Sequence, residues 1–347
     1  MSTKTKKAPA TDKDDARGVD VTEVDVESTI NMGDLGALDL KSLANRDKRD
    51  DNGAARLRVN KAYKMYVGGA FVRSESGRYL QVQAAAERGA DPGTVNVPRG
   101  SRKDARDAVL AAKNALDGWS ARTAYNRGQI LYRLAEVMES RREELATSLE
   151  RGGLTEQVAA VEVDAAVDRA VFYAGFCDKY QALVASSNPV SGPHFGFSVP
   201  EPMGVIGVVA PGVPTLLGLV STTLPVIAAG NTVVAIAGEN DPRTAIVWCE
   251  CLATSDLPGG VVNVLTGRAT EIAPHLAKHR EVIGIDAWTG DSALREVLER
   301  EGADNVKRVK THPTEGNMFW LDERKGQGIG WIERFIETKT VWHPVGI

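Results

Sequence analysis

The sequence predicts an α/β protein built on a parallel sheet, and three observations within residues 201–264 support this fold class. Short β-branched apolar runs recur, a stretch of helical length separates each run from the next, and Gly- or Pro-containing turns follow the helical stretches. The runs are Val205–Ala210, Thr232–Ile236 and Val261–Leu265, and the intervening helical stretches are Leu216–Ala229 and Pro242–Thr254. Apolar strands that alternate with helices form a parallel sheet that is buried on both faces.

A Rossmann-like sheet of this kind binds ligands beyond the carboxyl ends of its strands. We therefore expect any small-molecule site in the segments that follow the predicted strands. These segments are Ala210-Pro211, Ile236–Glu239, Thr266–Thr270 and Thr289–Asp291.

The same patterns place the remaining elements on either side of this region. Downstream, we expect helices at Ala269–Lys278 and Ser292–Glu301, and strands at Glu281–Asp286 and Val306–Lys310. Upstream, two short strands begin at Tyr63, and three helices are expected to pack on the first face of the sheet. These helices are Ser101–Leu116, which starts with a capping-box pattern, Asn126–Glu150 and Thr155–Leu183.

Composition excludes several classes of function. The 347 residues are 43% hydrophobic and 25% charged, with a net charge of −4, which favours neither nucleic acid nor anionic membrane as a partner. No apolar run reaches the ~20 residues of a membrane span, and the amino terminus lacks the apolar core of a secretory signal. Cys177, Cys249 and Cys251 have no metal-ligand spacing, so we expect buried thiols, no metal site and a cytoplasmic protein.

The two ends of the chain differ from the rest. Residues 1–60 interleave charges of both signs without aromatic side chains, and we expect them to be disordered. The last segment, IERFIETKTVWH at 332–343, ends as a β-prone strand with no partner nearby in sequence. Such a strand must join an existing sheet, in this molecule or in another copy.

Several motifs in order resemble the aldehyde dehydrogenase superfamily. The pattern EPMGVIGVVAP is followed by LPVIAAGNTVV, by Glu239 with Pro242 three residues later, and by LPGGVVNVLTG. The resemblance covers Tyr63–Lys310 and then Phe335–Trp342, where the sequence is similar to the family's closing oligomerisation strand.

The sequence patterns and the resemblance together divide the chain into six parts, and the resemblance implies oligomerisation residues in two of them. The parts are a disordered charged tail (1–60), strands and helices that pack on the sheet (61–184), an extended oligomerisation-type hairpin (185–200), a Rossmann-like cofactor-type domain (201–312), an irregular linker (313–331) and the oligomerisation strand (332–347). The oligomerisation residues that it implies are Phe197, Val199, Ile336, Thr338, Thr340 and Trp342.

The family's catalytic domain has no counterpart between Lys310 and the closing strand. No cysteine follows Cys251, so the resemblance implies no catalytic residue in this chain. The position of the family's oxyanion-stabilising Asn is occupied by Val213, which has no donor. The position of the family's general base falls near His312, which we interpret as an exposed loop histidine.

The cofactor positions are altered too. In the family's NAD- or NADP-binding Lys-Pro-Ser/Ala-Glu motif only Glu239 remains, as a vestigial ribose ligand or, as we favour, a surface carboxylate. Ala269 replaces a Gly that approaches the cofactor, and Asp291, expected to cap a helix, would repel a pyrophosphate.

Two functions follow from the resemblance. The first is a non-catalytic structural or regulatory subunit that forms homo-oligomers, or hetero-oligomers with a full-length aldehyde dehydrogenase. The alternative is an NAD(P)-dependent oxidoreductase that oxidises an aldehyde to an acid when a partner chain supplies the thiol. A nucleotide sensor is a third class of function that remains open.

Overall fold

The computed structural model describes residues 61–83 and 94–346. The tail predicted at 1–60 lies outside the described residues.

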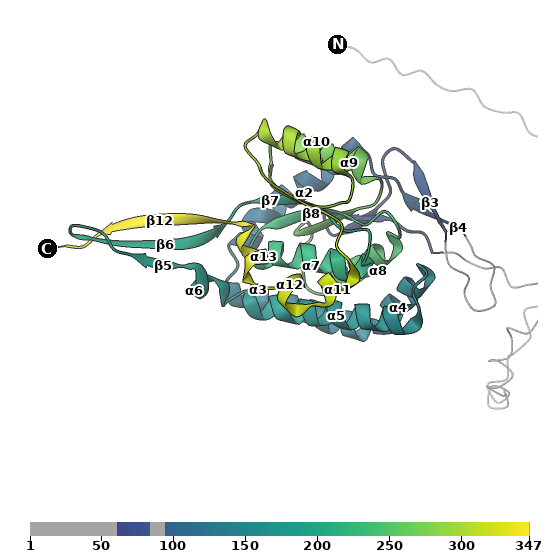
Figure 1. The fold of residues 1–347 in the computed structure, drawn as a ribbon, viewed down its shortest axis with the longest axis horizontal. Coiled ribbons are helices and arrows are strands. Elements are labelled where there is room, and N and C mark those ends of the chain that lie inside the picture. The colour runs from purple at the N-terminus through teal and green to yellow at the C-terminus, as the bar shows by residue number, and fades with distance from the viewer. Residues whose placement is uncertain (1–60, 84–93, 347) are drawn as a thin grey trace, which may run out of the picture. The chain divides into compact units, whose positions relative to one another are not determined.

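A seven-stranded sheet forms the centre of the described chain, in the order β11-β10-β7-β8-β9-β1-β2. Its central strands β7 and β8 are labelled in Figure 1. Its five successive strands β11 to β9 run parallel, and β1 and β2 are antiparallel at the edge. The strands are β7 (Val205–Val209), β8 (Thr232–Ile236), β9 (Val262–Leu265), β10 (Val282–Trp288), β11 (Arg308–His312), β1 (Met65–Val67) and β2 (Ala70–Val72). The predicted α/β class with a parallel sheet is confirmed.

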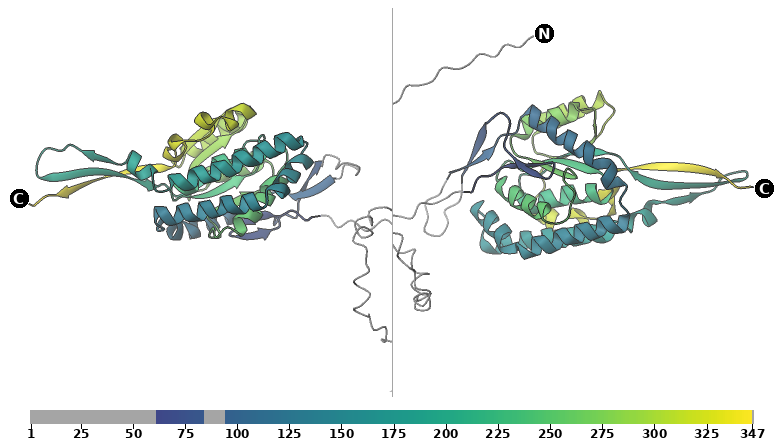
Figure 2. Two further views of the ribbon diagram at one scale, coloured as in Figure 1. Left: turned by 90° about the horizontal axis from the view of Figure 1, so that it is seen from below. Right: turned by 180° about the vertical axis from the view of Figure 1, so that it is seen from behind.

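Helices cover both faces of this sheet (Figures 1 and 2). One face packs on α2 (Arg102–Ser120), α9 (Ala269–Lys278) and α10 (Ser292–Ala303). The other packs on α7 (Thr215–Ala228) and α8 (Arg243–Ala253), behind which lie α3 (Ala124–Ser140), α4 (Arg142–Arg151) and α5 (Glu156–Phe176). The prediction that the three upstream helices share one face is therefore wrong. An apolar stripe shows that a helix has a buried side, but not which face of the sheet it meets.

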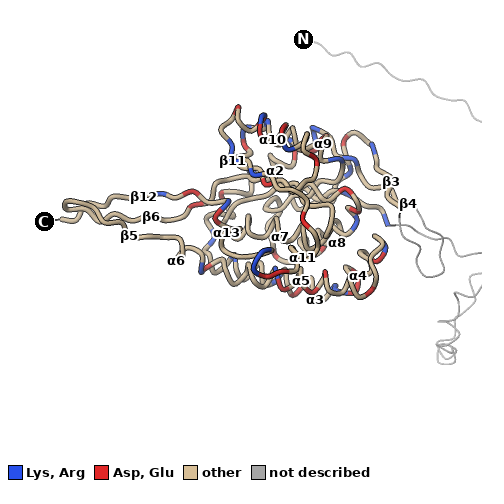
Figure 3. Tube along the Cα trace, viewed as in Figure 1, with Lys and Arg blue, Asp and Glu red and all other residues tan. Residues whose placement is uncertain are grey.

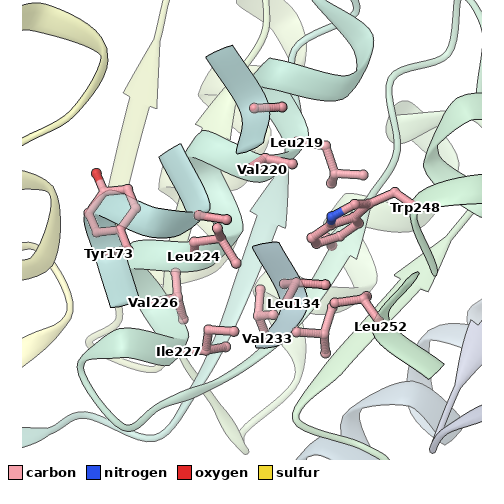
Figure 4. Packing of buried hydrophobic residues seen from close by; sticks show 14 of the residues in the cluster. Leu134, Tyr173, Leu219, Val220, Leu224, Val226, Ile227, Val233, Trp248 and Leu252 are labelled. Carbon is pink, nitrogen blue, oxygen red and sulfur yellow. The ribbon is translucent and has the colours of Figure 1, made fainter. Parts of the chain in front are cut away.

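The larger core lies between the sheet and the helices α5, α7 and α8. Leu219, Val220 and Leu224 of α7 are fully buried, and Trp248 of α8 packs in the same cluster (Figure 4). Helix α7 is buried along almost its whole length, which agrees with its continuous apolar sequence.

Two of the predicted upstream helices are interrupted. The stretch Asn126–Glu150 contains α3 and α4, which meet at Arg141 (φ −109°, ψ 20°). The Arg141 guanidinium pairs there with Glu144 and Glu250, the latter on α8. The apolar pattern continues through this break, so the sequence alone does not reveal it. The third predicted helix likewise divides into α5 and α6 (Tyr180–Val184).

The segment after Tyr63 contains three strands where two were predicted. The strands β1 and β2 form a hairpin on the central sheet, and β3 (Tyr79–Gln83) pairs with β4 (Thr94–Pro98) in a separate two-stranded sheet. The capping box that starts α2 is present, because Ser101 and Asp104 each accept the other's backbone N–H.

A third sheet, β12-β6-β5, extends away from the helices (Figures 1 and 2). It comprises β5 (Ser186–Asn188), β6 (His194–Pro202) and β12 (Ile336–Pro344). The closing strand β12 pairs antiparallel with β6 over its whole length, from Ile336 opposite Pro202 to Pro344 opposite His194. The strand that lacks a partner nearby in sequence therefore finds one in the same molecule.

The segment 313–331, predicted to be irregular, carries short helices. They are α11 (Asn317–Leu321), α12 (Glu323–Gly326) and the first part of α13 (Ile329–Glu333). The buried Arg169 of α5 holds this segment, because its guanidinium donates to the carbonyl oxygens of Trp320 (2.9 Å) and Gly326 and to Ser221 Oγ (2.6 Å). These contacts join residues at least 52 positions apart, so local sequence patterns do not predict them.

Candidate functional site

A pocket of about 280 Å³ lies at the carboxyl ends of β7, β8 and β10. Neighbouring strands β7 and β10 are followed by α7 and α10 on opposite faces of the sheet, so the pocket lies at the topological switch point. Its lining comes from all four predicted segments or their immediate neighbours, and includes Ala210, Gly212, Ala237, Glu239, Asn240, Ala269, Thr270, Thr289, Gly290, Asp291 and Thr314. The predicted position of a ligand site coincides with this pocket.

Two loops meet closely at the mouth of the pocket. A Cβ atom on Gly238 would lie 2.5 Å from the carbonyl oxygen of Pro211, so only glycine fits there. This contact fixes the segment that follows β8 against the segment that follows β7.

Carboxylates occupy the amino termini of the two helices that border the pocket. Asp291 Oδ1 accepts the N–H groups of Ala293 (2.9 Å) and Leu294 (3.1 Å) at the start of α10, which confirms its predicted capping role. Glu239 Oε1 accepts the N–H of Ala269 at the start of α9. Glu239 is exposed, as expected of a surface carboxylate. From the loop after β8 it also caps the amino terminus of α9.

The helices on the opposite face are capped in the same way. Glu162 of α5 accepts the N–H groups of Leu216 (2.7 Å) and Leu217 (3.2 Å) in the first turn of α7. Asp241 accepts the N–H of Arg243 (3.0 Å) at the start of α8. Burial raises the pKa of the Glu162 carboxyl, and its two hydrogen bonds from the backbone oppose that rise. Glu162 was not among the residues predicted from sequence, because only the fold brings it to α7.

Helix amino termini are the usual binding places for phosphate groups in sheets of this kind. Here, each of the helices α7, α8, α9 and α10 donates at least one of its first N–H groups to a carboxylate of the same chain. The residues that line the pocket include no lysine, arginine or histidine. The site therefore presents negative charge where an anionic ligand would need positive charge.

His312 lies in a different setting from the exposed loop that the sequence suggested. It ends strand β11, its side chain is 12% exposed, and its Nε2 is 2.8 Å from Oδ1 of the buried Asp286. The His312 ring stacks on the Trp288 ring at 3.8 Å between centroids, with an interplanar angle of 7°. The prediction is wrong because the parallel pairing of β10 with β11 carries the side chain inward.

The same cluster contains groups from the segment after β11. Trp288 stacks with Trp331 at 5.3 Å, and the Arg334 guanidinium lies 4.3 Å from the Trp331 ring. Asp286 Oδ2 accepts from Trp288 Nε1 at 2.9 Å. These contacts use the polar atoms of Asp286, so the cluster holds the chain segment in place and presents no free nucleophile.

Two basic residues at the start of β11, Lys307 and Arg308, make specific contacts with the backbone. Lys307 Nζ donates to the carbonyl oxygens of His279 (2.6 Å) and Val282 (2.5 Å), and burial lowers its pKa. Arg308 donates to the carbonyl oxygens of Arg334 (3.1 Å) and Ile336 (2.9 Å). Arg308 thus connects the central sheet to the start of β12.

The three thiols are buried, as predicted. Burial is the main reason that the pKa of Cys177 and that of Cys251 are each raised to about 12. The pKa of Cys249 is also raised, again mainly by burial. Thiols with such pKa values are protonated at neutral pH and are poor nucleophiles. Val213 lies before α7, 41% exposed, and presents only methyl groups at the oxyanion position.

The residues implied to form an oligomer interface lie on both faces of the third sheet. Register places Ile336, Thr338, Thr340 and Trp342 opposite Pro202, Pro200, Ser198 and Gly196, whereas Phe197 and Val199 point to the other face. Phe197 packs on Phe195 at 5.6 Å between ring centroids.

The outer part of this sheet exposes aromatic rings. Phe195 is 51% exposed and Trp342 is 63% exposed. Lys and Arg (blue) and Asp and Glu (red) are dispersed over the helices, whereas the far end of β6 and β12 carries almost none (Figure 3). Glu201, Glu337 and Lys339 lie nearer the helices, so the outer end of the sheet is apolar. This end, with the unpaired edge at β12, is a surface that suits another protein chain.

Within residues 61–83 and 94–346, no group of three or more His, Cys, Asp or Glu side chains could hold a metal ion. No helix among these residues combines the length and apolar character needed to cross a bilayer.

The fold and the position of the pocket define a Rossmann-like α/β protein, and comparisons with known proteins identify the family. A family model described as "Aldehyde dehydrogenase family" matches residues 71–314. The chain therefore belongs to the aldehyde dehydrogenase family. It is 29% identical over 307 residues to cytosolic 10-formyltetrahydrofolate dehydrogenase of Mus musculus, covering 84% of this chain and 33% of the mouse protein.

Other relatives and solved structures agree. An aldehyde dehydrogenase of Alternaria alternata is 28% identical over 278 residues, covering 77% of this chain and 54% of the fungal protein. A putative aldehyde dehydrogenase from Burkholderia cenocepacia and the NAD+ complex of an aldehyde dehydrogenase from Bacillus cereus are each 26% identical, with TM-scores of 0.68 and 0.67. Each comparison covers 73% of this chain and 51% of the solved chain. The chain thus spans about a third of the first curated relatives and about half of these solved structures.

Proposed function

We propose that this chain is a non-catalytic structural or regulatory subunit of the aldehyde dehydrogenase family. The observation that carries the proposal is the short connection from β11 to β12, in which residues 313–335 alone lead from the central sheet to the strand that resembles the family's closing strand. A catalytic domain of ordinary size does not fit into this segment. The segment is itself folded against α5 and α7 through Arg169.

The chemistry of the described residues supports the same proposal. The cysteine thiols are buried and protonated, and Val213 provides no oxyanion donor. The switch-point pocket does not fit a pyrophosphate, because Glu239 and Asp291 take up N–H groups at the two bordering helix termini and add negative charge. We therefore propose that NAD or NADP, the cofactors of the family, bind weakly or not at all.

The β5–β6–β12 sheet is the surface through which we propose association. Its occupant is a second copy of this chain or an active aldehyde dehydrogenase. In either case the unpaired edge of β12 provides backbone hydrogen bonds, and Phe195 and Trp342 provide apolar area.

Two measurements test the proposal. Thermal unfolding of the purified chain with NAD and with NADP tests the cofactor: ligand at 100 times its dissociation constant would add about 2.7 kcal/mol to the free energy of unfolding. We expect no shift. A clear shift would favour the alternative, an NAD(P)-dependent oxidoreductase that depends on a partner's thiol.

Light scattering after size-exclusion chromatography, alone and with an aldehyde dehydrogenase from the same source, tests association. The substitution Thr340→Pro removes a backbone donor in the middle of β12 and should reduce association, whereas Thr340→Ser should preserve it. A monomer that forms no complex, or association that Thr340→Pro leaves intact, would contradict the proposed subunit role.

A further inference from the structure

A second cavity, of about 470 Å³, lies between α2 and α9, away from the switch-point pocket. Its polar lining consists of basic side chains and histidines, and no aspartate or glutamate lines it. The lining residues are Arg102, Lys103, Ala105 and Arg106 of α2, with His275, Leu276, Lys278 and His279 at the end of α9. This set is called the basic groove below.

The spacing of these residues makes two facing rows. Arg102 and Arg106 are four residues apart and therefore lie on one side of α2. His275 and His279 have the same spacing at the end of α9. Ala105 and Leu276 are buried between the helices, so the floor of the groove is apolar and its walls are cationic.

Helix dipoles do not account for the α2 row. Cations near a helix carboxyl terminus are favoured by the dipole, which is sufficient to explain Lys278 on α9. Cations at an amino terminus are disfavoured, yet Arg102, Lys103 and Arg106 begin α2. Asp104 does not neutralise them from within the groove, because its carboxylate is buried and accepts from Ser74 Oγ (2.8 Å) and the backbone.

Three of the four cations that line the groove pair with carboxylates outside its lining, and Arg102 is the exception among the described residues. Lys103 pairs with Glu75, Arg106 with Asp107, and Lys278 with Glu301, all in exposed or partly exposed positions. Among residues 61–83 and 94–346, no ion pair or hydrogen bond of the Arg102 side chain is found. The pKa of His275 is lowered first by burial and then by Arg102 and Lys278, which indicates a positive potential inside the groove.

We propose that the basic groove binds a small ligand with more than one phosphate charge, such as a diphosphate or a bisphosphate. A volume of about 470 Å³ is in the usual range for small-molecule sites. The unpaired Arg102 guanidinium suits a bidentate contact to phosphate oxygens, and Arg106 can join it by exchanging its exposed pair with Asp107 for the ligand. The facing Lys278 and histidines supply further donors. The site is independent of the proposed subunit role, because it shares no residue with the switch-point pocket or with the third sheet.

Titration of inorganic pyrophosphate into the full chain by calorimetry tests the site. The double variant Arg102→Gln/Arg106→Gln should bind pyrophosphate at least about tenfold more weakly, since each charge-assisted hydrogen bond contributes about 1.5 kcal/mol or more. The matched control Arg133→Gln/Arg324→Gln removes the same charge from α3 and α12 and should retain the wild-type affinity. Urea unfolding of both variants checks that each is folded.

A second measurement follows His275 directly. Bound pyrophosphate offsets the repulsion from Arg102 and Lys278, so the pKa of His275, measured by NMR, should rise on binding. The proposal would be overturned if both double variants lost the same affinity for pyrophosphate, if the wild-type chain did not bind pyrophosphate, or if the pKa of His275 did not change. Orthophosphate that binds as tightly as pyrophosphate, or an oligonucleotide that binds more tightly through the same arginines, would also overturn it.

Discussion

The carboxylate of Asp291 has two separable consequences, one for stability and one for ligand binding. It accepts two N–H groups in the first turn of α10, at 2.9 and 3.1 Å. Replacement of such a cap by alanine costs about 1 kcal/mol, within a range of roughly 0.5–2 kcal/mol. Serine keeps an acceptor oxygen and removes only the charge, whose interaction with the helix dipole contributes about 0.3–1 kcal/mol.

We therefore expect an order of stability in which wild type exceeds Asp291→Ser, and Asp291→Ser exceeds Asp291→Ala. Urea denaturation followed by far-UV circular dichroism gives the free energy of unfolding for each protein. Thr289→Ala, which removes a hydroxyl that accepts from the Asp291 N–H at 3.2 Å, serves as the control for loop contacts outside the cap. An Asp291→Ala variant as stable as wild type would refute the assignment of Asp291 as a helix cap.

The ligand consequence has the opposite sign. A unit negative charge about 5 Å from a phosphate costs about 0.8 kcal/mol at the dielectric constant of water and about 3 kcal/mol at an effective value of 20. Asp291→Ser should therefore bind NAD more tightly than wild type, by roughly fourfold to 150-fold, despite its lower stability. Calorimetry with NAD measures the difference. Equal affinities in the two proteins would show that the Asp291 charge does not oppose the cofactor.

Two further predictions concern buried groups. Burial raises the pKa of Glu162 in the folded state, so folding favours the protonated form of this side chain. The ionised side chain therefore lowers the free energy of unfolding. This loss develops as the pH rises from the unfolded pKa of about 4.3 through the folded pKa. The variant Glu162→Gln retains an acceptor for the Leu216 N–H but carries no charge. Its free energy of unfolding relative to wild type, measured by urea denaturation, should therefore be greater at pH 7 than at pH 4. A stability difference between the two proteins that does not change with pH would contradict the role of burial. The three thiols should resist Ellman's reagent at pH 8 in the folded protein and react completely in denaturant. The reason is that all three are buried and that the thiols of Cys177 and Cys251 have a pKa of about 12. Rapid reaction of the native protein would show that a thiol is accessible.

The family and the central sheet could be predicted from sequence because their signals are local. The bounds of β8 and α9 agree with the predicted runs at Thr232–Ile236 and Ala269–Lys278, since apolar periodicity and turn residues act over a few positions. The position of the pocket followed from the rule that parallel strands end at one edge of the sheet.

The site itself was less predictable, and His312 shows why. Its neighbours in sequence, Pro313 and Thr314, indicate a loop, but its environment is made by Asp286 and Trp288 on the adjacent strand. Glu162 is a similar case, because its partners at the start of α7 are more than fifty positions away.

The sequence by itself determined the fold class, the order of the central strands along the chain and the family, because each depends on patterns within short windows. Only the tertiary structure decided which face α2 covers, where α3 ends, how residues 313–335 fold, and which carboxylate caps each helix around the pocket. These features depend on contacts between residues distant in sequence, and such contacts form only when the whole core packs.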